Sequence, residues 1–228
     1  MSGMIDATNA RRMSGMIDTA DAQVEGPVEG RIDGVVLAGG SGSRMQVNRG
    51  GQGKAWLPLG GLALIEHVAR NLAAQVQVLY VSTHDEPERY APIGIPVCDA
   101  SEERQGPLAG VLAAMAASRA PWLAVAPCDC PFLPPDWVAR LYGAALQAQA
   151  PLALASYQGS RQPVCMIVRC DVQPDLQAAL ARGVRKVGQW QRDVGAIAVP
   201  FDDAPGHSFM NVNTPDDLAR AEHWCQGR

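Results

Sequence analysis

The hydrophobic residues of the chain gather into short continuous runs instead of alternating strictly with polar ones. A run of this kind is typical of a strand that is buried on both faces, as in the interior of a parallel sheet. Segments with helical periodicity separate the runs. The pattern predicts strands at residues 34–38, 76–82, 122–126, 152–156, 164–168 and 196–201 and helices at residues 62–74, 108–118, 135–147, 171–182 and 214–226.

Strands that alternate with helices predict a three-layer α/β/α architecture with a mainly parallel central sheet. We assign residues 31–228 to this domain and residues 1–30, which carry the hexamer MSGMID twice, to a flexible N-terminal extension. The last helix has the clearest start, because Thr214 can cap its free amides and Pro215 suits the first helical position. Ligands of open sheets lie beyond the carboxyl ends of the strands, so residues just past Ala38, Ser82 and Ala126 are expected to face one site.

Composition and charge exclude several classes of protein. The 228 residues are 47% hydrophobic and 18% charged, which fits one well-buried domain. A net charge of -4 argues against a nucleic-acid-binding protein, and no apolar run is long enough to cross a membrane. The six cysteines lie mostly in or beside apolar runs and nothing resembles a signal peptide, so we expect reduced thiols and a cytoplasmic location.

A glycine-rich segment, LAGGSGSRM at residues 37–45, directly follows the first predicted strand. Glycines let backbone amides approach phosphate oxygens, and Arg44 and the later Lys54 would supply positive charge. The segment lacks the third glycine of the dinucleotide-binding fingerprint, and Lys54 lacks the following hydroxyl residue of a Walker loop. Spacing alone fits a plain turn as well as a phosphate-binding loop.

Asp129 stands just past the third predicted strand, in the sequence PCDCP at residues 127–131. A carboxylate there can hold Mg²⁺, which takes one or two carboxylates together with substrate phosphates. The alternative is that Asp129 only caps the turn into the next helix. The neighbouring Cys128 and Cys130 are expected to pack as small hydrophobic residues.

Two further segments carry polar residues at predicted loop positions. Asp99 follows a short apolar stretch, and Gly106 and the proline after it start a helix whose amino end can face the same crevice. Asn211 and Asn213 are two residues apart, so both carboxamides project to one side if this segment is extended. Each segment could equally serve only as a cap or a turn.

In combination and in this order, the glycine-rich segment, Lys54, GPLAG at residues 106–110, PCD at residues 127–129 and NVNTP at residues 211–215 resemble the molybdenum cofactor guanylyltransferase family. The match extends from about residue 33 to about residue 226. The resemblance implies a Rossmann-like nucleotidyltransferase fold. It also implies a reaction in which GTP and molybdopterin, or its molybdenum form, give the guanine dinucleotide cofactor and pyrophosphate.

The resemblance also implies roles for individual residues. Arg44, Lys54 and Asp129 are the predicted catalytic residues, and Asp129 is the predicted Mg²⁺ ligand. Lys54 would bind the phosphates, Asp99 the nucleoside, and a basic stretch at residues 185–186, with RQP at residues 161–163, the pterin end. The remaining predicted binding residues are Leu37, Ala38, Gly39 and Gly40 for the guanine nucleotide and Asn211 and Asn213 for the pterin substrate.

Three positions depart from the family pattern. Gly53 precedes Lys54 where the family usually has aspartate, the spacer at residues 46–53 is enlarged, and Ser82 stands where a family member has asparagine. Two alternatives therefore stay open: a nucleotidyltransferase of other specificity, such as a cytidylyltransferase for the same cofactor or a sugar-nucleotide pyrophosphorylase, and a non-catalytic GTP-binding adaptor that delivers the cofactor. The LAGG start favours the guanylyl group, since cytidylyl relatives usually carry Ala-Ala-Gly there. Molybdoenzyme-specific chaperones are the expected protein partners.

Overall fold

The computed structural model describes residues 30–39, 53–84, 86–98 and 106–226. The predicted site residues Gly40, Arg44 and Asp99, and nearly all of the predicted N-terminal extension, lie outside these ranges. Within them the chain forms a seven-stranded sheet and a two-stranded hairpin. The strands of the large sheet are β1 (Ile32–Leu37), β4 (Leu79–Ser82), β5 (Ile95–Val97), β6 (Trp122–Pro127), β7 (Leu152–Tyr157), β8 (Ser160–Arg169) and β9 (Ile197–Pro200).

The strands of the sheet lie in the order β5-β4-β1-β6-β8-β7-β9. Strands β4 and β6 flank β1 in parallel, and β5 runs parallel to β4. Strand β8 runs antiparallel to both β6 and β7, and β9 is parallel to β7. The predicted mainly parallel sheet is therefore confirmed, with β8 as the reversed strand.

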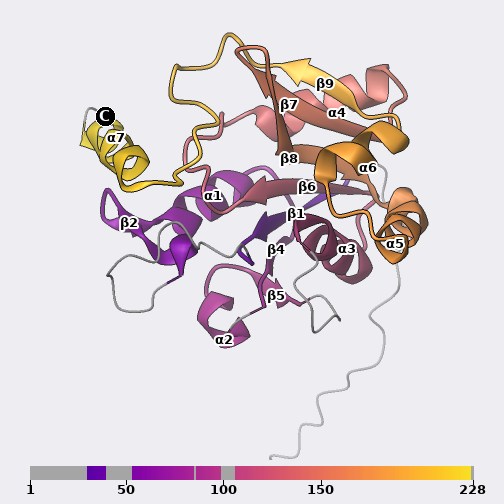
Figure 1. Ribbon diagram of the computed structural model, residues 1–228, viewed down its shortest axis with the longest axis horizontal. Helices are drawn as coiled ribbons and strands as arrows, with labels where there is room; N and C mark the ends of the chain where they lie inside the picture. Colours follow the sequence, from indigo (N-terminus) through magenta and orange to yellow (C-terminus); the bar gives the residue numbers. More distant parts are fainter. Residues whose placement is uncertain (1–29, 40–52, 85, 99–105, 227–228) are drawn as a thin grey trace, which may run out of the picture.

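Helices cover both faces of this sheet, as Figure 1 shows for α1 and α3 on opposite sides of β1. Val36 of β1 packs in the layer formed with α1 and α4, and its neighbour Val35 packs in the layer formed with α3, α5 and α6. Burial on both faces explains the continuous apolar run that begins at residue 34 of β1. The helices are α1 (Leu64–Ala73), α2 (Pro87–Tyr90), α3 (Pro107–Ala117), α4 (Trp137–Gln147), α5 (Gln173–Ala181), α6 (Val187–Asp193) and α7 (Pro215–Gln226), with 3-10 turns η1 (Lys54–Trp56) and η2 (Cys170–Val172).

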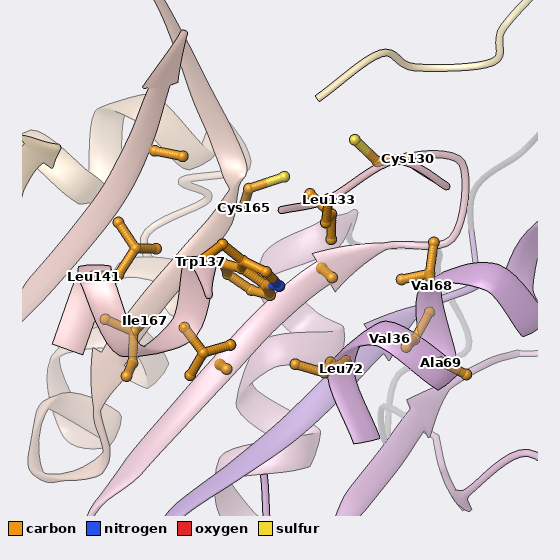
Figure 2. Close-up of a cluster of buried hydrophobic side chains, with 14 of the residues drawn as sticks. Val36, Val68, Ala69, Leu72, Cys130, Leu133, Trp137, Leu141, Cys165 and Ile167 are labelled. Atoms are coloured by element: carbon orange, nitrogen blue, oxygen red, sulfur yellow. The ribbon is translucent and has the colours of Figure 1, made fainter. Parts of the chain in front are cut away.

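Trp137 of α4 occupies the centre of the layer between α1 and α4 (Figure 2). Its indole N–H donates to Oδ1 of Asn71 at 3.0 Å, and the Asn71 amide donates to the carbonyl of Leu133 at 2.9 Å. Buried polar groups of this kind need such partners. The bonds fix α1 against the segment between β6 and α4, which also carries Asp129.

The main deviation from the predicted elements lies before α1. Residues 62–63, predicted as helix, form strand β3 (Leu62–Ala63), which pairs with β2 (Pro58–Leu59) in a hairpin. Gly60 and Gly61 form its turn with φ of 55° and 87°, the left-handed conformation that two-residue hairpin turns require. The predicted start of β4 at residue 76 is also too early, because residues 74–75 form the turn that closes α1 and the strand begins at Leu79.

Helix α7 packs against the β2-β3 hairpin instead of the large sheet. Ala221 of α7, Val212 and Phe132 share a small apolar cluster with Leu57, Leu59 and Leu64. The predicted cap at its start is confirmed, since the Asp217 N–H donates to Oγ1 of Thr214 at 3.1 Å. Among the helices that the structure describes, none is both long enough and apolar enough to span a bilayer.

Candidate active site

Three parallel strands end side by side at the site. The Ala38 N–H, just past β1, donates to the carbonyl of Ser82 at the end of β4 at 2.8 Å. On the other side, the Cys128 N–H, just past β6, donates to the carbonyl of Leu37 at 3.1 Å. In Figure 1 the arrowheads of β1 and β6 point to the side of the molecule on which the segment entering α7 lies. The structure thus brings the predicted strand ends together at one edge.

Lys54 connects two parts of this edge that are distant in sequence. Its Nζ donates a hydrogen bond to Oδ2 of Asp129, with which it forms an ion pair, and a second one to Oδ1 of Asn213 at 2.5 Å. The side chains of Lys54 and Asp129 are 14% and 18% exposed, so the pair is largely shielded from water. Three of the predicted site residues therefore meet at one ammonium group.

Asp129 retains one carboxylate oxygen for a further ligand. Its Oδ1 is buried and has no hydrogen-bond partner within the part of the chain that the structure describes. Leaving a buried charged oxygen without a partner is costly unless a ligand completes it. Among the described residues no group of three His, Cys, Asp or Glu side chains could hold a metal by itself. A hard cation that takes one protein carboxylate and draws its other ligands from phosphate and water, such as Mg²⁺, fits this donor set.

The backbone around Asn213 is fixed from two directions. The Val212 N–H donates to the carbonyl of Asp129 at 2.8 Å, which ties this segment to the end of β6. Oδ2 of Asp217 accepts the amides of Asn213 and Thr214 at 3.0 and 2.9 Å. Burial alone would raise the pKa of Asp217, but hydrogen bonds from Thr214, Arg220 and these two amides outweigh burial and lower the pKa below its ordinary value. The carboxylate is therefore the form that orders this turn.

The two cysteines beside Asp129 are packed residues in this structure. Both thiols are buried in the layer between α1 and α4. Burial, followed by the charge of Asp129, raises the pKa of Cys128 to about 12. A hydrogen bond with Cys165, and then burial, raises the pKa of Cys130 well above its ordinary value. Both thiols stay protonated at neutral pH, so neither supplies a nucleophile.

Other predicted residues take different positions. Leu37 ends β1, with Ala38 and Gly39 directly after it, at the sheet edge that also carries Cys128 and Asp129. Asn211 is exposed and has no hydrogen bond to any described residue. Nη1 of Arg185 donates to the carbonyls of Leu180 and Val184 at 2.8 and 3.2 Å, so this guanidinium caps the end of α5.

The structure also shows residues that the sequence patterns did not single out. Trp56, two residues after Lys54, packs on the Tyr90 ring with centroids 5.2 Å apart, and the Arg89 guanidinium lies 4.5 Å from the Trp56 centroid. These contacts attach η1, and with it Lys54, to α2. The only sequence signal was an isolated tryptophan near a lysine, which by itself does not point to a site.

The central strands of this mainly parallel sheet carry Gly39 and the shielded Asp129 just past their carboxyl ends, and Lys54 of η1 pairs with Asp129 there. This is the architecture of a nucleotidyltransferase. Comparisons with known proteins agree. Residues 34–194 match the family described as "MobA-like NTP transferase domain". The chain is 42% identical over 195 residues to the molybdenum cofactor guanylyltransferase of Cereibacter sphaeroides, covering 84% of this chain and 96% of that protein.

A second relative, the molybdenum cofactor guanylyltransferase of Shewanella sp. (strain MR-4), is 39% identical over 193 residues, covering 83% of this chain and 94% of that protein. Among solved structures, the molybdopterin-guanine dinucleotide biosynthesis protein A of Archaeoglobus fulgidus superposes with a TM-score of 0.71 at 26% identity. That alignment covers 86% of this chain and all of the other. The chain belongs to the molybdenum cofactor guanylyltransferase family.

Proposed function

We propose that this protein transfers GMP from GTP to molybdopterin or the molybdenum cofactor, forming the guanine dinucleotide cofactor and pyrophosphate. The observation that carries the proposal is the placement of Lys54 between Asp129 and Asn213. These are the residues that the family resemblance links to the phosphates, the metal and the pterin substrate. Their convergence on one ammonium is what a reaction between two bound phosphate compounds requires.

The reaction joins two phosphates without a protein nucleophile. An oxygen of the terminal phosphate of the pterin attacks the α-phosphorus of GTP, the bond from that phosphorus to the bridging oxygen breaks, and pyrophosphate leaves. The protein's task is then to orient the two phosphates and to offset the charge that builds up on them. Lys54 is placed to do so at the end of β6, and Asn213 is placed to orient it from the side of α7.

Asp129 is the residue that would hold Mg²⁺, through the oxygen that has no partner among the described residues. When bound, Mg²⁺ would offset negative charge on the phosphates. Lys54, which pairs with the other carboxylate oxygen of Asp129, would contribute its positive charge to the phosphates beside the cation. Arg44 is proposed as a further cationic residue and lies outside the described residues.

The alternative of a non-catalytic adaptor was suggested by Gly53 and the enlarged spacer before Lys54. Gly53 does not displace the lysine, since the η1 turn that it precedes places Lys54 on Asp129. This observation favours the enzyme.

A cytoplasmic location and delivery of the product to molybdoenzyme-specific chaperones belong to the same proposal. The location is supported by six cysteines that are all free thiols in the structure.

The test is pyrophosphate release by the purified protein with Mg²⁺ and molybdopterin, offered GTP and CTP in parallel, with mass identification of the pterin product. A guanine dinucleotide formed with GTP is the expected result. Preference for CTP would assign the protein the cytidylyl activity. Nucleotide binding without pyrophosphate release from either substrate would support the adaptor instead.

A further inference from the structure

The end of β4 offers a different side chain to the crevice from the one that the family pattern suggests. The resemblance places an asparagine that contacts the nucleotide at the position of Ser82. Here Ser82 is only 5% exposed, and a Cβ added to Gly110 of α3 would lie 2.3 Å from its Oγ. Helix α3 therefore rests directly on Ser82. The next residue, Thr83, is 2% exposed, so it too is closed off from the crevice.

His84 is the first side chain past β4 that is not fully buried, and it packs against the end of β1. A Cβ added to Gly39 would lie 2.9 Å from Cδ2 and 3.5 Å from Nε2 of the His84 ring. Real Cβ atoms essentially never show the shorter distance, so a larger residue at position 39 would have to displace the His84 imidazole. The φ of Gly39 is outside the left-handed region, so the His84 ring, and not the backbone conformation, is what disfavours a side chain here.

The position of this contact relates it to the nucleotide. Gly39 follows Ala38, whose N–H donates to the carbonyl of Ser82. The Lys54–Asp129 pair lies just past the end of β6, the strand on the other side of β1. Because β4 and β6 flank β1 on opposite sides, His84 lies on the β4 side of the crevice and Asp129 on the β6 side. Because the phosphates are proposed to bind at Lys54 and Asp129, the nucleoside of GTP would extend toward the β4 side of the crevice.

We propose that His84 is a positioning residue for the nucleotide: its imidazole packs against Gly39 and holds the end of β1 where the backbone contacts the nucleoside of GTP. The inference rests on the proposed function. It assigns to His84, and not to Ser82, the contribution of β4 to substrate binding. It also explains Gly39 as the partner that makes room for the imidazole.

The experiment compares His84→Ala, Gly39→Ala, the double variant and Ser82→Ala, with the KM for GTP, the KM for molybdopterin and kcat as readouts. Gly39→Ala is expected to raise the KM for GTP by about tenfold to a hundredfold, because the methyl group and the imidazole cannot both keep their places and the end of β1 loses its support. His84→Ala is expected to raise the KM for GTP less, with kcat and the KM for molybdopterin unchanged. The double variant is expected to recover most of the loss of Gly39→Ala, and Ser82→Ala to behave as wild type.

Gly143→Ala is the matched control, since a Cβ there meets nothing within 4 Å. A double variant as impaired as Gly39→Ala would overturn the proposal, because the methyl group would then be clashing with the nucleotide itself. A larger rise in the KM for GTP in Ser82→Ala than in His84→Ala would also overturn the proposal. If Gly39→Ala does not fold, the split between KM and kcat in His84→Ala decides.

Failure of the proposed function would look different. A wild-type protein that binds no GTP in calorimetry would refute the function and with it the nucleotide role of His84. If wild type binds GTP and the double variant recovers nothing, only the role of His84 is refuted. Thermal unfolding of the nucleotide-free variants checks the packing separately, with a lowered Tm for Gly39→Ala that the double variant restores.

Discussion

Lys54 donates a hydrogen bond to Asn213, which follows it by 159 residues. The same ammonium contacts Asp129, so the first and last parts of the domain meet at the carboxyl end of β6. The ammonium lies where a phosphate-bound cation would also be attracted, because both would be drawn to the Asp129 carboxylate. In the free enzyme Lys54 is therefore paired with Asp129, the residue that is proposed to bind the Mg²⁺ that accompanies the substrate phosphates.

Replacing Lys54 by alanine is expected to lower kcat for GMP transfer by about a hundredfold or more, the typical cost of removing one preorganised donor from an active site. Steady-state pyrophosphate release at saturating GTP and molybdopterin measures it. Arg169→Ala is the control, because Arg169 pairs with Asp171 at the amino end of β6, far from the crevice, and both side chains are exposed. An unchanged kcat would remove Lys54 from the reaction.

Asp129→Asn is expected to raise the Mg²⁺ concentration for half-maximal rate by at least about tenfold, because the amide supplies a neutral oxygen in place of a charged one. Direct binding of Mn²⁺ followed by electron paramagnetic resonance gives a readout that does not depend on turnover. Asp171→Asn, at an exposed ion pair, serves as control. Mn²⁺ binding that is identical in wild type and Asp129→Asn would place the metal on other residues.

Asp217 predicts a specific dependence of stability on pH. Its pKa is lower in the folded protein than its ordinary value, so the carboxylate stabilises the fold above the unfolded-state pKa. This contribution is lost as the pH falls through the lowered folded-state pKa. We expect Asp217→Asn to unfold more easily at pH 7 and to differ less from wild type at acid pH.

The free energy of unfolding, measured by urea unfolding of wild type, Asp217→Asn and Asp216→Asn from acid to neutral pH, tests this dependence of stability on pH. Asp216 is exposed and makes no hydrogen bond to a described residue, which makes it a suitable control. Asp217→Asn is also expected to raise the KM for molybdopterin, because the Asp217 carboxylate accepts the backbone amide of Asn213 and so holds that residue in place. Equal pH dependence in all three proteins would contradict the role of Asp217.

The fold followed from the sequence wherever burial was two-sided or a cap was explicit. The continuous apolar run around Val35 and Val36 predicted a buried strand, and in the structure the two side chains do face different helical layers. Thr214 was identified as a cap from its own chemistry and that of its neighbours. Strand β5 (Ile95–Val97) and helix α6 (Val187–Asp193) were missed because a three-residue strand and a seven-residue helix are too short to show a period.

The site was predictable in part. The rule that ligands lie at the carboxyl ends of strands placed Gly39 and Asp129 at one edge. It could not place Asn213, which lies far past the end of β9 on a long connection and is held near Lys54 by the bond from the Val212 N–H to the Asp129 carbonyl. Nor could it find His84, since the contact with Gly39 depends on how tightly two strand ends pack. Long-range packing of this kind leaves no local pattern.

The six thiols are expected to differ widely in reactivity. Cys98 is exposed, whereas Cys128 is buried with a pKa raised to about 12. Reagents attack the thiolate, so a buried thiol that stays protonated at pH 8 reacts only after the protein opens. We expect an aromatic disulfide reagent to modify Cys98 rapidly in the native protein and Cys128 and Cys130 only upon unfolding. Peptide mapping by mass spectrometry identifies the modified residues.

Cys98→Ser is expected to abolish the fast phase and leave GMP transfer intact, because Cys98 lies at the end of β5 and has no proposed part in the reaction. Cys128→Ala is expected to retain the activity with a lower Tm, since a small buried side chain is removed and no nucleophile is lost. Loss of kcat in Cys128→Ala at unchanged stability would instead show that the thiol acts in the chemistry. The Tm and kcat of this variant therefore separate packing beside Asp129 from catalysis.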